Sequence, residues 1–194
     1  MNKFDASFWQ QRYEDGTTGW DIGYPSGPLK RYIDGIEDKS LKVLIPGCGN
    51  AYEAGYMFEK GFTNVFIIDI APAPIQNFKN KFPNFPEDHI LLGDFFELEP
   101  SFDLILEQTF FCALDPSMRP QYVTKMAQLL RTGGKLAGVL FSTIFEKEGP
   151  PFGGTSDEYQ ALFSNYFIIN KLNPETESIA PRAGNEVFIE FTKP

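Results

Sequence analysis

KVLIPGCGNAYEAGYMFEKG, residues 42–61, is the stretch that decides the fold of this chain. An apolar run meets Gly47, Cys48 and Gly49 and then passes into a helical pattern. A strand that leads through a glycine loop into a helix is a widespread way of holding a nucleotide. Residues 42–61 therefore predict a nucleotide site at the end of a strand, and they leave open which nucleotide it holds.

Strand-like runs of the same kind recur along the chain, with helical patterns between them. They occupy residues 41–47, 64–70, 89–94, 102–108 and 135–142. Short apolar runs with little alternation are typical of parallel strands that are buried on both faces. The alternation of strand and helix predicts an α/β fold with a doubly wound sheet, whose strands end along one edge where ligands bind.

Proline residues indicate where several helices begin, because proline is favoured in the first turn of a helix. On this basis Pro28, Pro74 and Pro120 each open one helix. The helix from Pro120 is expected to carry Leu130 on its buried face and to end at the glycine pair 133–134.

The two ends of the chain add further elements to this sheet. Residues 1–40 carry no strand pattern and are expected to form helices that precede the sheet. Near the other end, Thr155 and Glu158 form a capping box for a further helix. The last apolar segments, 166–172 and 186–191, are expected to pair as antiparallel strands.

Composition restricts the class of protein. The chain has 194 residues, 42% of them hydrophobic, which is enough for one large folded domain. Its net charge of −9 disfavours nucleic acid as a partner, because an acidic surface repels phosphate. No run approaches the roughly 20 apolar residues that span a bilayer, and the first residues lack the apolar core of a secretion signal. The oligomeric state stays open, a monomer included.

The cysteines and the histidine exclude further classes. Cys48 and Cys112 stand in apolar surroundings that are typical of reduced, buried thiols, so a cytoplasmic location is expected. His89 is the single histidine of the chain. One histidine leaves no metal constellation and no Ser-His-Asp triad, so we expect neither a bound metal nor hydrolase chemistry of that type.

Three nucleotides compete for the glycine loop. A nucleoside triphosphate would need Gly-Lys-Ser/Thr where this chain has Asn-Ala-Tyr at 50–52, and it is rejected. NAD would need a third glycine where Tyr52 stands, which argues against NAD without excluding it. S-adenosylmethionine, a nucleoside without phosphate, remains, and its amino-acid end needs the backbone room that two glycines supply.

Two acidic residues extend the pattern to the next strands. Asp69 ends the second strand, where a carboxylate can accept hydrogen bonds from both ribose hydroxyls. Asp94 follows the third strand and is placed to accept from the adenine amino group, with Phe95 offering a backbone N–H and an apolar face. Alone, Asp69 reads equally well as a helix cap and Asp94 as a turn residue. Together with the glycine loop, Asp69 and Asp94 favour a site for S-adenosylmethionine. A purely structural explanation would have to apply separately to the loop, to Asp69 and to Asp94.

Further motifs connect the chain to a known group. They are GWDIG at 19–23, FFCALDPSMRP at 110–120, GPPF at 149–152 and IAPRAGNE at 179–186, together with Trp9, Asp69 and Asp94. With the glycine loop, these motifs resemble the thiopurine S-methyltransferase superfamily, and within it most of all the plant-type methyl halide and thiol methyltransferases. The likeness covers nearly the whole chain from Phe8 onward.

This resemblance implies a fold and a cofactor. The fold is that of class I methyltransferases, a Rossmann-like sheet of seven strands with the last one antiparallel and with helices on both faces. Residues 1–194 would form a single domain, in which 1–40 are a helical lid. S-adenosylmethionine would be the cofactor, and a small molecule would accept the methyl group. The residues implied in cofactor binding are Trp9 and Trp20, Gly47, Cys48 and Gly49, Asp69 and Ile70, Asp94 and Phe95, and Glu107.

The acceptor site is implied at 107–112, at GPPF and at Arg182. Relatives that methylate halides tend to have Asp-Tyr, and those that methylate thiopurines Asp-Arg, where this chain has Glu107 and Gln108. Gln108 and Arg182 are therefore candidates for positioning the acceptor, with Arg182 attracting an anion. Soft acceptors such as thiolates, halides and thiocyanate need no base, which suits a chain with one histidine.

Two other functions stay open at this point. One is an NAD-dependent oxidoreductase, against which Tyr52 argues. The other is a non-catalytic module that binds S-adenosylmethionine, which the unusual pair Glu107 and Gln108 keeps in consideration.

Overall fold

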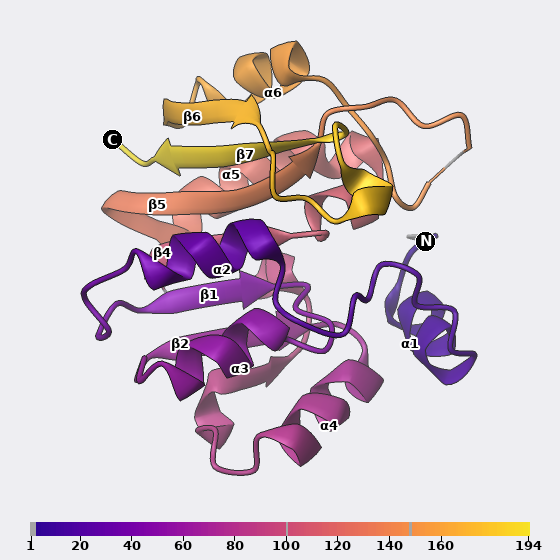
Figure 1. Ribbon diagram of the computed structural model, residues 1–194, viewed down its shortest axis with the longest axis vertical. Coiled ribbons are helices and arrows are strands. Elements are labelled where there is room, and N and C mark those ends of the chain that lie inside the picture. Colours follow the sequence, from indigo (N-terminus) through magenta and orange to yellow (C-terminus); the bar gives the residue numbers. More distant parts are fainter. Residues whose placement is uncertain (1–2, 100, 148) are drawn as a thin grey trace.

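Seven strands form one sheet in the order β3-β2-β1-β4-β5-β7-β6. The computed structural model shown in Figure 1 describes residues 3–99, 101–147 and 149–194. The strands are β1 (Val43–Pro46), β2 (Val65–Asp69), β3 (Ile90–Leu92), β4 (Phe102–Gln108), β5 (Leu130–Phe141), β6 (Ile168–Pro174) and β7 (Glu186–Thr192). Strand β7 is antiparallel to both of its neighbours, while the other paired strands are parallel. The predicted seven-stranded sheet with an antiparallel last strand is confirmed.

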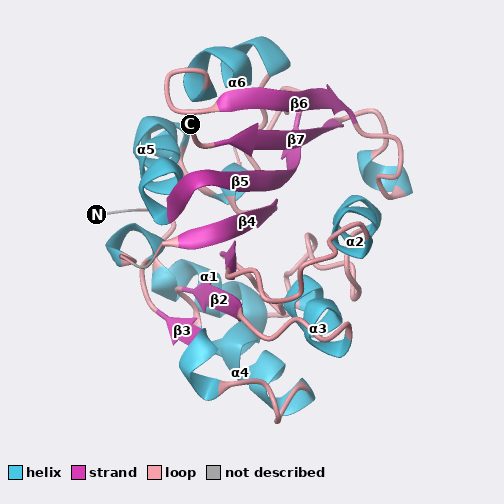
Figure 2. Cartoon of the chain, turned by 90° about the vertical axis from the view of Figure 1, so that its left-hand side faces the viewer, coloured by secondary structure: helices cyan, strands magenta, loops and turns pink. Residues whose placement is uncertain are grey.

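Helices cover both faces of the sheet, as predicted (Figure 2). One face carries α2 (Gly27–Asp34), α3 (Tyr52–Glu59) and α4 (Pro72–Lys81), and the other carries α5 (Arg119–Leu129) and α6 (Ser156–Phe163). Helix α1 (Ala6–Glu14) stands apart, at the edge where the parallel strands end (Figure 1). Short 3₁₀ helices occupy Glu87–His89 (η1), Phe95–Glu97 (η2), Phe111–Ala113 (η3), Pro116–Met118 (η4) and Ala180–Arg182 (η5).

Alternation along the central strands divides the apolar side chains between two cores. Val43 and Ile45 of β1 pack with α2, α3 and α4, whereas Leu44 between them packs with α5 and α6. Successive side chains of a strand point to opposite faces, so a strand that is covered on both sides must be apolar throughout. This is why the strands read as almost uninterrupted apolar runs in the sequence.

Two predicted helix boundaries are wrong. Helix α4 begins at Pro72 rather than at Pro74, one residue after the capping position of Ala71. Helix α5 ends at Leu129, and Leu130 already pairs with β4. The glycine pair 133–134 therefore lies inside β5, at a shift in the β4–β5 register, instead of closing the helix. A left-handed glycine serves a strand bulge as well as a helix end, and the sequence alone does not separate the two.

Other local predictions are confirmed. The hydroxyl of Thr155 accepts a hydrogen bond from the Glu158 N–H at the start of α6. Strands β6 and β7 pair antiparallel. In the described part of residues 1–40 the regular elements are helical, and β1 follows them. Within residues 3–99, 101–147 and 149–194, no helix combines the length and the apolar character that a membrane crossing requires.

Candidate functional site

A cavity of about 450 Å³ opens at the edge where the parallel strands end. Its wall combines the N-terminal residues, the loops that follow β1 to β4, the segment 150–151 and Arg182. The sequence-predicted residues that line it are Trp9, Trp20, Gly47, Cys48, Gly49, Asp69, Ile70, Asp94, Phe95, Gln108 and Arg182. These residues lie far apart in the chain, and the topology brings them to one hollow because parallel strands end together.

The two glycines of the loop are required by its backbone conformation and by protein side chains that lie close against it. Gly47 and Gly49 have φ angles of +53° and +52°, in the left-handed region that glycine adopts without strain. A Cβ on Gly47 would lie 2.2 Å from the ring of Phe110, and one on Gly49 would lie 2.8 Å from the hydroxyl of Tyr13. Both positions therefore exclude any side chain, Gly47 most strictly.

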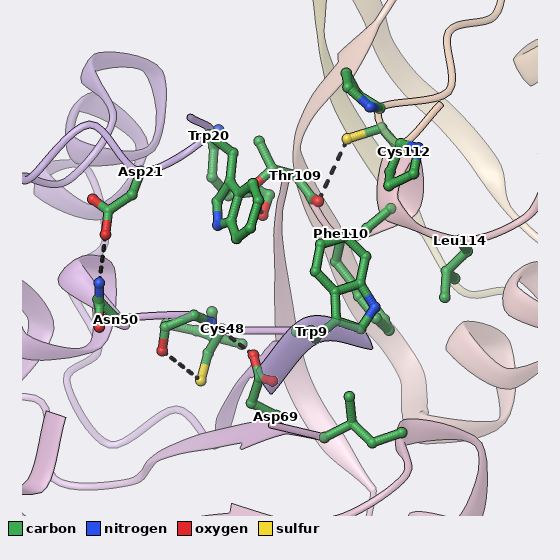
Figure 3. Close-up of a pocket in the computed structure, with 18 of the residues that line it drawn as sticks. Trp9, Trp20, Asp21, Cys48, Asn50, Asp69, Thr109, Phe110, Cys112 and Leu114 are labelled. Carbon is green, nitrogen blue, oxygen red and sulfur yellow. Dashed lines mark hydrogen bonds between the residues drawn. The ribbon is translucent and has the colours of Figure 1, made fainter. Parts of the chain in front are cut away.

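Asp69 joins the end of β2 to the glycine loop. Its Oδ2 accepts a hydrogen bond from the Gly49 N–H at 2.9 Å (Figure 3). Its Oδ1 accepts one from the Ala71 N–H, also at 2.9 Å. Burial raises the pKa of this carboxyl, and the two N–H groups oppose that rise. Each carboxylate oxygen has a second lone pair. Asp69 thus fixes the turn that precedes α4 and keeps lone pairs for further hydrogen bonds from a ligand in the cavity.

The neighbouring strand end supplies a flat, apolar wall. Asp94 accepts a hydrogen bond from the Phe96 N–H at 2.9 Å and so begins the short helix η2. Phe95 is buried, and its ring lies 5.1 Å from that of Phe110. An adenine-sized group that lies against this wall would meet one carboxylate and an aromatic surface.

Aromatic residues of the N-terminal segment form the opposite wall. The rings of Trp9 and Trp20 meet edge to face at 5.4 Å, and Tyr13 lies 5.8 Å from Trp20 (Figure 3). Phe4 contacts Phe152, which extends this wall to the GPPF segment. An aromatic face attracts a cation by about 0.5–2 kcal/mol once water is excluded. The wall therefore suits a ligand that carries a positive charge next to an apolar group.

Sequence reasoning missed Asp21, which ties this wall to the glycine loop. Its carboxylate accepts hydrogen bonds from the Asn50 side chain and, at 3.2 Å, from the Tyr52 hydroxyl (Figure 3). Tyr52 stands where a dinucleotide loop has its third glycine, so that position serves here as an attachment point for the N-terminal segment. The motif GWDIG contains Asp21, and it was the only signal in the sequence that pointed to this residue.

The remaining wall combines apolar residues with several polar ones, among them Ser26, Glu53, Gln108, Thr109 and Arg182. Gln108 and Arg182 line the cavity near Cys112 and the prolines 150–151. The Arg182 guanidinium donates to the Trp20 carbonyl at 2.8 Å and lies 3.7 Å from the Glu186 carboxylate. Part of its charge is therefore balanced by the protein. Burial raises the pKa of the Cys112 thiol, in agreement with the prediction that this residue is an apolar group rather than a nucleophile.

Comparison with known proteins agrees with this geometry. The model of the thiopurine S-methyltransferase family matches residues 4–190. The chain belongs to the thiopurine S-methyltransferase family. It is 31% identical to probable thiol methyltransferase 2 of Arabidopsis thaliana, over the whole of this chain and 88% of that one. It is 25% identical to the thiopurine S-methyltransferase of Photobacterium profundum, over 93% of this chain and 92% of that one.

Solved structures share the fold of this family member. The 1,6-didemethyltoxoflavin-N1-methyltransferase of Burkholderia thailandensis, solved with S-adenosylhomocysteine, has a TM-score of 0.77 and 20% identity, over 97% of this chain and 86% of that one. A TehB-like methyltransferase of Corynebacterium glutamicum has a TM-score of 0.69 and 20% identity. The chain is accordingly a class I methyltransferase that uses S-adenosylmethionine. Neither the oxidoreductase nor the non-catalytic module gains support from these comparisons.

Glu107 corrects the predicted set of cofactor-binding residues, because it lies beneath the cavity wall rather than in it. Its carboxylate is buried and accepts hydrogen bonds from the Phe110 and Phe111 N–H groups and from the Tyr122 hydroxyl. These bonds hold the turn in which Thr109 adopts a φ of +59°, a strained value for a residue with a β-branched side chain. Glu107 therefore shapes this part of the cavity wall from behind.

His89 and Arg119 lie outside the cavity lining. The His89 ring stacks on Phe66 at 4.0 Å beside β3. Arg119 forms an ion pair with Glu158 and donates to the Gly153 carbonyl at 2.6 Å. Both side chains have structural surroundings.

The burial of Glu107 predicts a particular dependence of stability on pH. Burial raises the pKa of Glu107 to about 7 in the folded protein, against 4.5 for an ordinary glutamate. The folded state holds this proton between those pH values and the unfolded state does not. The contribution of this proton to the free energy of unfolding is complete below about pH 4.5 and is lost by about pH 7. Its size is on the order of 3 kcal/mol.

Glu107→Gln is expected to remove the loss of stability that Glu107 causes between about pH 4.5 and pH 7. The wild-type free energy of unfolding should fall more steeply between pH 4.5 and 7 than that of the variant, because glutamine keeps the acceptor for Phe110 and Phe111 but does not ionise. Urea denaturation of both proteins across this range measures the difference. Parallel curves would show that Glu107 keeps an ordinary pKa in the folded protein.

Proposed function

We propose that this methyltransferase transfers a methyl group from S-adenosylmethionine to a small soft nucleophile, which is the sulfur of a thiol, thiolate or thiopurine, or a halide or thiocyanate. One observation carries the proposal: a single cavity joins the glycine loop and Asp69 to an apolar recess that contains Gln108 and Arg182. The names of the relatives, thiol, thiocyanate and thiopurine methyltransferases, are consistent with such an acceptor.

The residues of the cavity fit the parts of the cofactor in order. We assign the loop from Gly47 to Gly49 to its amino-acid end and Asp69 with Ile70 to the ribose. Asp94 and Phe95 would bind the adenine. We assign Trp9 and Trp20 to the sulfonium, since aromatic rings attract a positive charge. When it is bound, S-adenosylmethionine supplies an activated methyl group.

The chemistry asked of the protein is alignment and exclusion of water. A displacement at carbon needs the acceptor, the methyl group and the sulfonium in line, which a closely fitting apolar pocket provides. Anionic sulfur needs no base, and His89 does not line the cavity. Gln108 and Arg182 are the polar groups that we assign to the acceptor.

We also retain three predictions about the protein as a whole. The described residues of 1–40 place α1, Trp9 and Trp20 against the cavity, which supports a role of this segment as a lid of a single domain. A cytoplasmic location remains our prediction. A small molecule rather than nucleic acid or a membrane surface is the partner that we expect.

Methyl transfer from isotopically labelled cofactor tests the proposal. Purified protein should methylate at least one member of a panel that contains iodide, thiocyanate, hydrosulfide, an aromatic thiol and a thiopurine, with volatile products collected separately. Amines and phenols serve as controls, because they must lose a proton and should give little product. Product from amines or phenols alone would contradict the proposed acceptor class.

A further inference from the structure

Resting on the proposed function, we propose that Ser26 is a positioning residue for the acceptor. Ser26 turns the amide of Gln108 so that its two N–H groups face the cavity, and this orientation selects small anions over neutral acceptors. The assignment narrows the acceptor class to anions such as thiocyanate, iodide or a thiolate.

The hydroxyl of Ser26 does not cap the helix that follows it, although Ser26 stands at the capping position. Ser26 occupies the capping position of α2, and serine is favoured there because its oxygen accepts from the first N–H groups of the helix. Here the side chain makes no such hydrogen bond. Its Oγ instead donates to Oε1 of Gln108 at 2.9 Å, across 82 positions of sequence. The hydroxyl therefore contacts the end of β4, and it also acts on the Glu53 carboxylate in α3, instead of capping its own helix.

A second contact fixes the place of Ser26. Its backbone N–H donates to Oε1 of Glu53 at 2.9 Å, and both residues are buried. Glu53 lies in the first turn of α3, directly after the glycine loop. Arg182 is the cation whose charge acts on this carboxylate. Ser26 is thus held between the loop assigned to the cofactor and the wall assigned to the acceptor.

These contacts determine which polar atoms of the Gln108 amide are available to a ligand. A carboxamide is planar, with its oxygen and its NH₂ group on opposite sides. The oxygen of Gln108 is occupied by Ser26, and its Nε2 makes no hydrogen bond to another described residue. Because Gln108 lines the cavity, we place the NH₂ group at the acceptor recess. Two N–H donors and the Arg182 guanidinium then border this part of the cavity, whose lining also contains Thr109 and the Glu53 carboxylate on which the charge of Arg182 acts.

Such a recess distinguishes anionic from neutral acceptors by their charge and by the hydrogen bonds that they form. An anion gains hydrogen bonds from donors that have no other partner. A neutral amine offers one lone pair and carries no charge, so it gains a weaker hydrogen bond from the same donors. The phenol or guanidinium that relatives tend to carry at this position is replaced here by a neutral donor that depends on Ser26 for its direction.

Binding of thiocyanate to the protein saturated with S-adenosylhomocysteine tests this inference by calorimetry. Gln108→Glu should weaken thiocyanate binding at least about 100-fold, because like charges in a desolvated site repel strongly. Gln108→Leu removes the donors without adding charge and should weaken it about tenfold. Ser26→Ala should weaken it about fivefold, and Ser26→Thr, which keeps the hydroxyl, should restore it.

Controls separate this inference from the proposed function. Ser40→Ala removes a surface hydroxyl that bonds to Asp38 and should change nothing. Every variant should bind S-adenosylhomocysteine within about twofold of wild type, since Gln108 and Ser26 act on the acceptor. Thiocyanate binding that is unchanged in Ser26→Ala, or retained in Gln108→Glu, would overturn the assignment. Failure of the wild type to bind S-adenosylhomocysteine would instead contradict the proposed function.

Discussion

Asp69→Ala is expected to weaken the binding of S-adenosylhomocysteine by about 1–3 kcal/mol, or roughly 5- to 150-fold. The carboxylate has two tasks that alanine cannot perform. It holds the Gly49 and Ala71 N–H groups, and its remaining lone pairs are assigned to the two ribose hydroxyls. Calorimetry with S-adenosylhomocysteine measures the loss directly.

Asp103→Ala provides a matched control for this prediction. Asp103 also accepts a hydrogen bond from a backbone N–H, that of Lys42 at 2.9 Å, and it pairs with Arg131. It lies at the start of β4, at the opposite edge of the sheet from the cavity. Its loss should lower the melting temperature and leave the affinity for S-adenosylhomocysteine unchanged. Equal affinities of Asp69→Ala and wild type would place the ribose elsewhere.

Gly47→Ala is expected to damage both stability and cofactor binding. The new methyl group would lie 2.2 Å from Cδ2 of Phe110, and the backbone would keep a φ of +53° that disfavours alanine. The left-handed conformation and the overpacking together cost about 2–5 kcal/mol of unfolding free energy. Because the loop must move to relieve the contact, affinity for S-adenosylhomocysteine should fall at least about tenfold.

Gly61→Ala isolates the two causes of this effect. Gly61 has a φ of +84°, and nothing lies within 4 Å of a Cβ there. Its substitution should cost only the backbone term, about 1–2 kcal/mol, with normal binding. The double variant Gly47→Ala with Phe110→Ala should cost less than the sum of the two single variants, because the shortest contacts of the new methyl group are with the Phe110 ring. If denaturation shows that Gly47→Ala and Gly61→Ala lose the same free energy of unfolding, a steric role for Phe110 is ruled out.

Local patterns were sufficient for the architecture of this protein. Branched apolar runs predicted the strands, since a strand covered on both faces has no polar side. The glycine loop and Asp69 could be recognised because each lies beside a strand end in the sequence, and the structure places them in one cavity. One error arose at Pro74, because Pro72 stands two residues earlier in the first turn of the same helix. The other arose at the glycine pair 133–134, because a left-handed glycine serves both a helix end and a strand bulge.

The hydrogen bonds between residues far apart in the sequence could be identified only from the folded structure. No pattern near Ser26 indicates that its hydroxyl meets Gln108, and none near Asp21 indicates a bond to Asn50. Likewise, nothing local shows that Glu107 meets the Tyr122 hydroxyl beneath the wall instead of facing the cavity. The physical reason is that periodicity and turn chemistry act between near neighbours in sequence. The direction of a polar side chain depends on which distant groups the topology brings within hydrogen-bond reach.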